Sequence, residues 1–187
     1  MADPRTTTNG GLGYTLRLLG LELSKKRNLK ITPALTQELS QLLTIAALTV
    51  SNKAKGRATV DTGRLRSAIF PNFAQGELAS EVRARSKYAA FVEFGTGPLG
   101  ASTNTQTLPP GYVHGPAYFP PPKALQRWAE RHGIKGSGAG FLVARKIFMA
   151  GGTKARPFLG PSFDEEKGPL VEKMQGALDR AKQKAAK

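Results

Sequence analysis

The sequence has no cysteine, which excludes both a disulfide framework and a thiolate metal site. It also lacks any run of the roughly 18 apolar residues that a membrane-spanning helix needs. The residues after Met1 are polar, unlike the apolar core of a signal peptide. We therefore expect a soluble, unprocessed chain with no membrane partner, for which an intracellular assembly environment is allowed but not required.

Groups that carry catalysis are also scarce. The two histidines, His114 and His132, have no nearby acid and serine that would complete a triad, so both are expected on the surface. The glycine cluster at 136–140 follows a predicted helix and lacks the Gly-Lys-Ser/Thr ending of a phosphate-binding loop. Asp61 and Glu93 lie beside arginine-rich or turn sequence, which favours structural ion pairing over acid–base chemistry. With no metal-ligand spacing present, we predict no catalytic residue, no cofactor, no metal and no enzymatic activity.

Acidic residues are few: 13 face 28 lysines and arginines, which gives a formal charge of +15. The excess lies in residues 1–60 (9 basic, 3 acidic) and 61–160 (13 basic, 5 acidic), whereas residues 161–187 are nearly balanced (6 and 5). Such a charge attracts polyanions or acidic proteins. Aromatic residues make up only 7% and do not interleave with the basic ones, so contact with an acidic partner or with passing DNA is favoured over sequence-specific recognition.

The turn Asp61-Thr62-Gly63 organises the chain around it. A long helical pattern precedes it, with Thr32 as N-cap and Pro33 at the first helical position, and ends near Gly56. Strand-like alternation follows from residue 67 to residue 85, with a hairpin loop at 72–76. Since Leu65 separates Arg64 from Arg66, we predict that both guanidinium groups lie on one face of an extended segment.

After the predicted hairpin, the sequence predicts a long loop and three further helices. Residues 88–94 either continue the sheet or form one helical turn, and the Gly/Pro-rich residues 98–120 are interpreted as a protruding loop. Two helices follow, the first with Trp128 in its core stripe. A final helix has acids first and bases last, with a kink or restart expected at Gly168-Pro169.

The predicted fold class is α+β. The long N-terminal helix and the C-terminal helix pack on a small, mainly antiparallel sheet formed by residues 65–94. Residues 33–187 form a single domain with an insertion at about 98–152, and residues 1–32 form an N-terminal arm. Residues 1–13 are expected to be flexible or ordered by a partner, while the leucine-rich segment after them is either a short helix or an interface strand.

Three sequence pieces occur in order: VDTGRLRSAI at 60–69, YAAFVEFGTG at 88–97 and ARPFLGPSF at 155–163. Together they resemble the tail-component family of long-tailed, lambda-like bacteriophages, whose members are described as tail-completion, neck or minor tail (lambda Z-type) proteins. The resemblance covers about 33–97 and 153–180, and it departs from the family at Ala68, at Ser162-Phe163 and at Gly168-Pro169. The motif residues are Asp61, Thr62, Gly63, Leu65, Arg66, Tyr88, Glu93, Gly95, Thr96, Arg156, Pro157 and Phe158.

The resemblance implies a structural virion protein of the head-to-tail junction that forms a homo-oligomeric ring around the DNA path. Its partners would be its own copies, the adjoining head–tail connector and tail proteins and, non-specifically, genomic DNA. It would be found in the virion and, during assembly, in the host cytoplasm. Contacts with DNA in the ring lumen or with an acidic partner are expected from Arg64, Arg66, Arg83 and Arg85. The alternative is a basic nucleic-acid-binding module, and a toxin-like or nuclease enzyme is disfavoured by the missing catalytic groups.

Overall fold

The structure of the protein is a computed structural model that describes residues 5–8, 11–17, 32–73, 78–109 and 112–185. The leucine-rich and basic residues 18–27, most of the predicted hairpin loop and the ends of the chain lie outside these described residues. The α+β class is confirmed. No helix in the described ranges is both long enough and apolar enough to cross a membrane.

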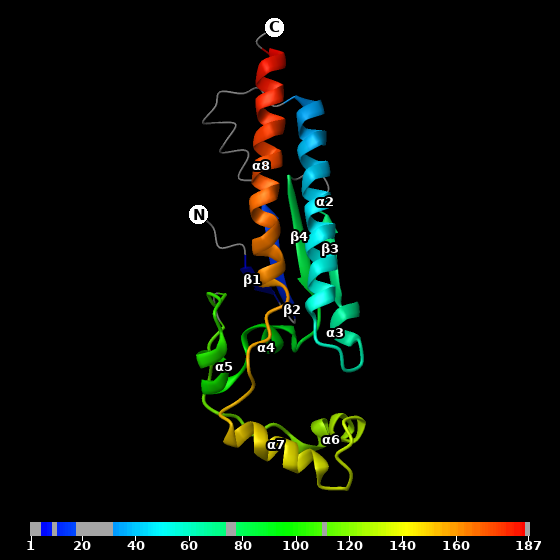
Figure 1. Cartoon of the computed structure of the whole chain (residues 1–187), viewed down its shortest axis with the longest axis vertical. Helices are drawn as coiled ribbons and strands as arrows, with labels where there is room; N and C mark the ends of the chain where they lie inside the picture. The colour runs from blue at the N-terminus through cyan, green and yellow to red at the C-terminus, as the bar shows by residue number, and fades with distance from the viewer. Residues whose placement is uncertain (1–4, 9–10, 18–31, 74–77, 110–111, 186–187) are drawn as a thin grey trace.

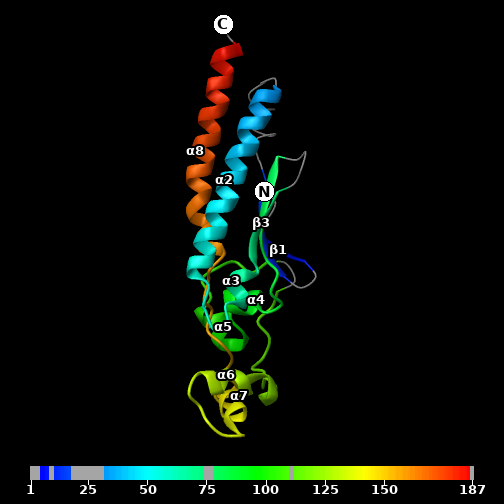
Figure 2. The same ribbon diagram turned by 90° about the vertical axis from the view of Figure 1, so that its right-hand side faces the viewer.

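Two long helices form one layer of the molecule: α2 (Pro33–Arg57) and α8 (Gly160–Ala185). They run antiparallel and side by side (Figures 1 and 2). The hydroxyl of Thr32 accepts a hydrogen bond from the Leu35 amide at 3.3 Å, which confirms the predicted cap. Against the prediction of a restart, α8 is a single helix with Pro169 inside it, since burial of Leu170 and of the turns that follow holds it together.

A four-stranded antiparallel sheet packs under this helix pair in the order β1-β2-β4-β3. The strands are β1 (Arg5–Thr8), β2 (Gly11–Arg17), β3 (Ile69–Phe73) and β4 (Ala79–Ala84). Burial alternates along β4, where Val82 and Ala84 face the core. Strands β3 and β4 pair as the predicted hairpin, although Asn72 and Phe73, which were assigned to its loop, belong to β3 and Ser67 belongs to a helix.

The interpretation of residues 1–13 as an arm that is flexible or ordered by a partner is wrong for β1 and for the start of β2. Strand β2 pairs with β4 over six residues, from Leu12 opposite Ala84 to Arg17 opposite Ala79, and β1 pairs with β2. The physical reason is that β4 has two edges and β3 occupies only one, so the other edge takes backbone hydrogen bonds from β2. Thr- and Gly-rich sequence does not prevent such main-chain pairing.

The turn at 61–63 leads into a single helical turn, α3 (Arg64–Ser67), instead of an extended segment. Arg64 and Arg66 therefore lie about 200° apart around a helix axis, so the prediction that they share one face is wrong. The amide of Ala68 closes the turn on the carbonyls of Arg64 and Leu65, both at 3.1 Å. Burial of Leu65 in the core holds this turn against the body.

Gly63 has φ 75°, in the left-handed region, as its turn chemistry predicts. We expect Gly63→Val to lower the free energy of unfolding by about 1 kcal/mol, because a β-branched residue resists this conformation. The space around the position is open, so no clash adds to this strain. Urea unfolding measures the loss, and Gly63→Asn is the matched variant that should lose less, since Asn tolerates positive φ. Equal stability of the Val variant and the parent protein would contradict the prediction.

The segment after β4 is more ordered than predicted. Residues 88–94 form a helical turn, α4 (Ala89–Phe94), and the first part of the predicted loop is a second short helix, α5 (Gly97–Thr103). Farther along, Pro109 is buried and Tyr112 packs against the main core. The protruding-loop interpretation is thus wrong for these residues, because their apolar side chains find cover on the chain's own body.

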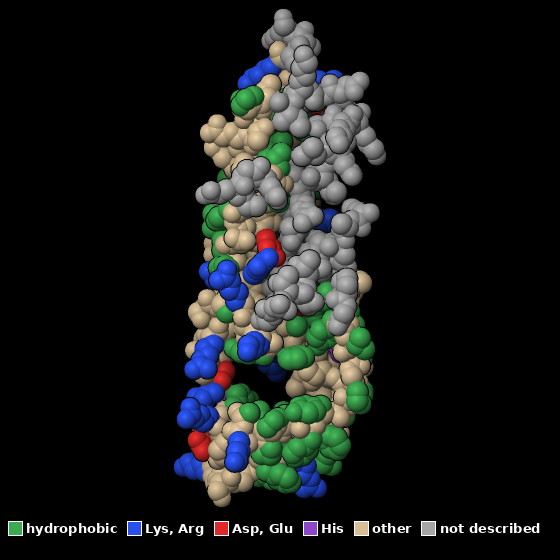
Figure 3. Space-filling view, turned by 180° about the vertical axis from the view of Figure 1, so that it is seen from behind, with side chains coloured by type: hydrophobic (Ala, Val, Ile, Leu, Met, Phe, Trp, Pro, Cys, Tyr) green, Lys and Arg blue, Asp and Glu red, His purple; other side chains and the backbone are tan. Residues whose placement is uncertain are grey.

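The predicted helical pair is present as α6 (Pro122–Arg131) and α7 (Ala139–Met149). With the residues around it, this pair forms the α6–α7 lobe (residues 116–150), at the end of the molecule away from the C-terminus (Figure 1). The lobe presents a large apolar area to solvent on one face (Figure 3). Trp128 is 36% exposed and stacks on the His132 ring, so its predicted place in the core is wrong. Its helix packs on α7 through the small residue Ala129 instead.

Candidate functional site

The carboxylate of Glu93, at the end of α4, is buried and holds the start of α8. Its Oε2 atom accepts hydrogen bonds from the amides of Phe158 at 2.8 Å and Leu159 at 2.9 Å. Its Oε1 atom accepts from the Gly160 amide at 2.7 Å and from the side-chain amide of Gln106 at 3.1 Å. These three backbone groups would otherwise lack partners, because the first amides of a helix have no intrahelical acceptor. Glu93 is thus a helix cap supplied from a distant segment. Glu93, Gln106 and the amides of residues 158–160 together form the Glu93 node.

The predicted ion pairing is wrong for Glu93, since no lysine or arginine in the described ranges forms an ion pair with it. Burial raises the pKa of Glu93, and the four N–H donors oppose that rise. The positive end of the α8 dipole also favours a negative charge at this position. Asp61, by contrast, does form the predicted ion pair, with Arg131 of α6, and this hydrogen bond holds the pKa of its carboxyl below the usual range.

A narrow neck of two antiparallel segments joins the α6–α7 lobe to the body. The backbones of Thr96 and Thr153 exchange hydrogen bonds at 3.0 and 3.2 Å, and their hydroxyls lie 2.9 Å apart. Glycines allow this approach: a Cβ on Gly152 would lie 1.9 Å from the Thr96 carbonyl oxygen. The Leu99 amide adds a bond to the Gly151 carbonyl at 3.1 Å. The lobe is therefore rigidly attached beside Glu93.

Two rings from the segment after α5 cover the carbonyl groups at the end of α4. The Tyr112 hydroxyl donates to the Gly95 carbonyl at 2.5 Å, and Nε2 of His114 lies 2.8 Å from the Phe94 carbonyl oxygen. His114 is half-buried, so the expected surface position is wrong for it, whereas His132 is exposed as predicted. Partial burial also raises the pKa of Tyr112.

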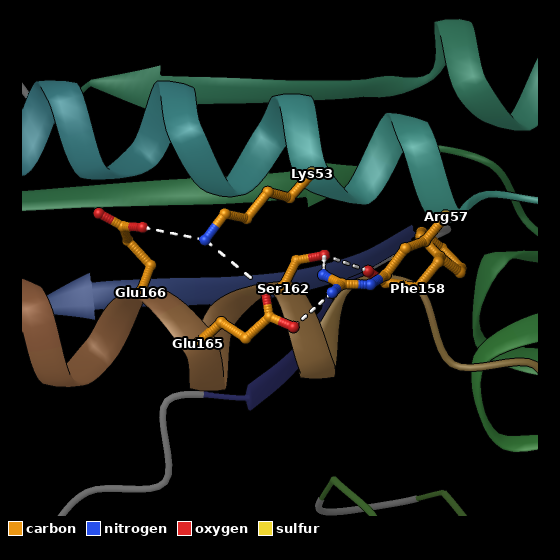
Figure 4. A network of polar contacts seen from close by, with 6 residues as sticks. All are labelled: Lys53, Arg57, Phe158, Ser162, Glu165 and Glu166. Carbon is orange, nitrogen blue, oxygen red and sulfur yellow. Dashed lines mark hydrogen bonds and ion pairs between the residues drawn. The ribbon is translucent and has the colours of Figure 1, made fainter.

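A second polar network fastens α8 to α2 just beyond the Glu93 node (Figure 4). The Arg57 guanidinium donates to the Ser162 hydroxyl at 2.8 Å, and that hydroxyl donates to the Phe158 carbonyl at 2.7 Å. Arg57 also pairs with Glu165, which holds the pKa of this carboxyl below its ordinary value. Lys53 bridges Glu165 and Glu166 at 3.5 and 3.3 Å.

The structure brings the second and third sequence motifs together at the start of α8, and the first motif contributes to the same hydrophobic core. Leu65 of the first motif is in the core, Glu93 of the second caps α8, and Phe158 of the third is fully buried. The amide of Arg156 donates to the Val92 carbonyl at 2.8 Å, which adds a main-chain link between the second and third motifs. The side chains of the remaining polar motif residues are exposed, namely those of Thr62, Arg66, Tyr88 and Arg156.

Sequence reasoning missed two members of this arrangement. Gln106 lies within the segment interpreted as a loop, and Arg57 lies just beyond the predicted helix end near Gly56. Ser162 is one of the positions at which the sequence departs from the family resemblance, and its hydroxyl links Arg57 to the backbone. No group of three or more His, Asp and Glu that could hold a metal ion occurs among the described residues.

The four arginines predicted to meet DNA or an acidic partner are not equivalent. Arg64, Arg66 and Arg85 are exposed, and the Arg85 amide donates to Ala68 at 3.0 Å, so all three lie near α3. Arg83 is half-buried and its Nε lies 2.7 Å from Glu81, which neutralises it. The guanidinium of Arg85 lies 4.2 Å from the Phe70 ring centroid. Among the described residues, the exposed arginines at this end of the sheet are therefore Arg64, Arg66 and Arg85.

The buried carboxylate of the Glu93 node binds the chain's own backbone, so the node joins α4 to the start of α8. Residues 26–95 match the family model described as "Bacteriophage HK97-gp10, putative tail-component". This segment, which carries α2, α3, the β3–β4 hairpin and α4, is that of a bacteriophage tail-component family, and the resemblance carried by the first two motifs is confirmed. Comparison with curated proteins found no match, and comparison with solved structures found none either.

Proposed function

We propose that the protein is a non-catalytic structural subunit of the head-to-tail junction of a tailed phage, where it forms a homo-oligomeric ring around the DNA path. The observation that carries the proposal is the tail-component match over residues 26–95. The Glu93 node supports it, because buried carboxylate hydrogen bonds make a stiff building block from segments far apart in sequence.

The charge of the chain supports a place near DNA or near acidic neighbours. The formal charge is +15, and Arg64, Arg66 and Arg85 project from one end of the sheet. In a ring, each subunit repeats these charges around the axis, so modest screened attractions add up over the copies. Arg83 contributes less to this field, because Glu81 pairs with it.

Strands β1 and β2 pair in the chain's own sheet, so residues 5–8 and 11–17 do not serve as a free arm between copies. The outer side of α2 carries two large apolar side chains, Ile45 at 56% and Leu48 at 44% exposure. We assign this side of α2 to the contact between ring subunits, since apolar side chains of this size gain from burial.

Electron microscopy of the purified protein tests the ring, and virions labelled for the protein test its place at the head–tail junction. Replacing Arg64, Arg66 and Arg85 together with glutamine should reduce the joining of heads to tails by at least about tenfold if each of the three loses a favourable contact of about 0.5 kcal/mol in every subunit. The matched control replaces Arg180, which lies at the far end of α8 and pairs with Glu38 of α2.

Two results would contradict the proposal. The first is a label elsewhere in the virion or a protein that stays monomeric at all concentrations tested. The second is tight binding of isolated duplex or RNA with a steep salt dependence, which is the behaviour of the alternative nucleic-acid-binding module.

A further inference from the structure

The outer side of α7 carries an unusually apolar surface. Four of its side chains are largely exposed: Phe141 at 52%, Leu142 at 57%, Phe148 at 45% and Met149 at 71%. Phe119 joins them, with its ring centroid 5.8 Å from that of Phe141 and 5.9 Å from that of Phe148. This set forms the α7 face. Contiguous exposed apolar areas of this kind mark interaction sites.

The chain's own core does not cover the α7 face. The opposite side of α7 already packs on α6 through small residues, with Ala139, Gly140 and Ala144 buried. The Gly140 amide donates to the Gln126 side chain at 2.8 Å, which fixes the two helices against each other. The main hydrophobic core lies in the body and contains none of the lobe's residues. None of the main-core residues among those that the structure describes covers this face, so it is open to a partner molecule.

Charge indicates what that molecule presents. At 100° per residue, Arg145 falls between Phe141 and Met149 on the wheel of α7, so a guanidinium sits within the apolar face and Lys146 lies at its edge. Both side chains, with Leu142 and Met149, line a shallow surface depression. Residues 122–149 carry six lysines and arginines against one acid, Glu130, which accepts a hydrogen bond from Gln126.

We propose that the α7 face binds a segment of a different virion protein in which aspartate or glutamate stands among apolar side chains. The same face of a second copy is the wrong occupant, because residues 122–149 carry six lysines and arginines against one acid, and two such faces would repel each other. An anionic membrane is disfavoured, since Arg145 would lie inside the apolar face rather than on its polar side. A carboxylate opposite Arg145 would pair with its charge, and the apolar side chains beside that carboxylate would cover the rest of the α7 face. The inference rests on the proposed place in the virion.

Site-specific photocrosslinking in assembled virions tests this binding. The photoreactive residue p-benzoylphenylalanine replaces Met149, and a matched control replaces Val171 on α8, whose side chain is 40% exposed. We expect an adduct between the Met149 position and one other virion protein, mapped by peptide mass spectrometry to a segment with acidic and apolar residues. We expect no such adduct from the Val171 position.

Charge reversal then tests the recognition chemistry. Arg145→Glu should reduce the yield of this adduct at least tenfold, whereas Arg127→Glu, an exposed change on α6, should leave it within twofold of the parent. An adduct with a second copy, with lipid or with nucleic acid would overturn the assignment, as would no adduct in virions that contain the protein. Absence of the protein from purified virions would instead refute the proposed function together with the inference that rests on it.

Discussion

Replacing Glu93 with alanine should lower the free energy of unfolding by about 3–5 kcal/mol, because it leaves buried N–H donors without an acceptor and opens a cavity. Three of those donors lie at the start of α8: the amide of Gly160, its first residue, and those of Phe158 and Leu159 just before it. Water cannot readily replace the carboxylate there, since both Glu93 and the residues around it are buried. Urea unfolding followed by circular dichroism measures the loss.

Two further variants separate the hydrogen bonds from the general cost of changing a glutamate. Glu93→Gln keeps the side-chain volume and one acceptor oxygen, so its loss should be smaller than that of the alanine variant. Glu38→Ala removes an exposed carboxylate that pairs with Arg180, and we expect it to cost less than about 1 kcal/mol. Equal losses at Glu93 and Glu38 would show that the node does not hold α8.

The elements that sequence predicted well are those whose signal lies within one segment. The apolar stripe and the Thr32-Pro33 start predicted α2 to within one residue, because helix period and capping are local. The alternation along β4 is local too, and so is the need for positive φ at Gly63. The helix at 64–67 was missed, since a single turn is too short to show a period.

Features that depend on a distant partner could not be predicted in this way. Strand β2 exists as a strand because β4 offers it an edge about 70 residues later in the chain, which no local pattern records. Glu93 was assigned an ion pair because a lone acid in sequence gives no sign of backbone donors that lie 65 to 67 residues away. A buried carboxylate is satisfied by N–H groups as readily as by a cation.

The second and third sequence motifs nevertheless include the residues that form the Glu93 node. The second motif supplies Glu93 and the third supplies the amides from Phe158 to Gly160, so each is useful only in the presence of the other. The insertion between them begins and ends at the neck, where Thr96 and Thr153 pair. The chain therefore carries the lobe between these motifs without disturbing the node, although about 60 residues separate them.

Gly152→Ala should lower the free energy of unfolding by about 3 kcal/mol and loosen the α6–α7 lobe. The added Cβ strains the backbone at a positive φ and also clashes with the backbone of Thr96. Gly152 has φ 121°, which side chains rarely adopt. The added Cβ would lie 1.9 Å from the Thr96 carbonyl oxygen and 2.7 Å from its carbonyl carbon, so the two sides of the neck must separate. Opening the neck breaks the paired hydrogen bonds of Thr96 and Thr153.

Limited proteolysis measures the local effect, since Lys154 lies in the neck and trypsin should cut after it faster in the variant than in the parent. Gly63→Ala is the matched control: its φ of 75° imposes strain, but nothing lies within 4 Å of the added Cβ. We expect about 1 kcal/mol from that strain alone and no faster cleavage at Lys154. If both variants lose the same stability and leave this cleavage unchanged, close packing of the neck does not fix the lobe, and the α7 face is not held in one orientation by it.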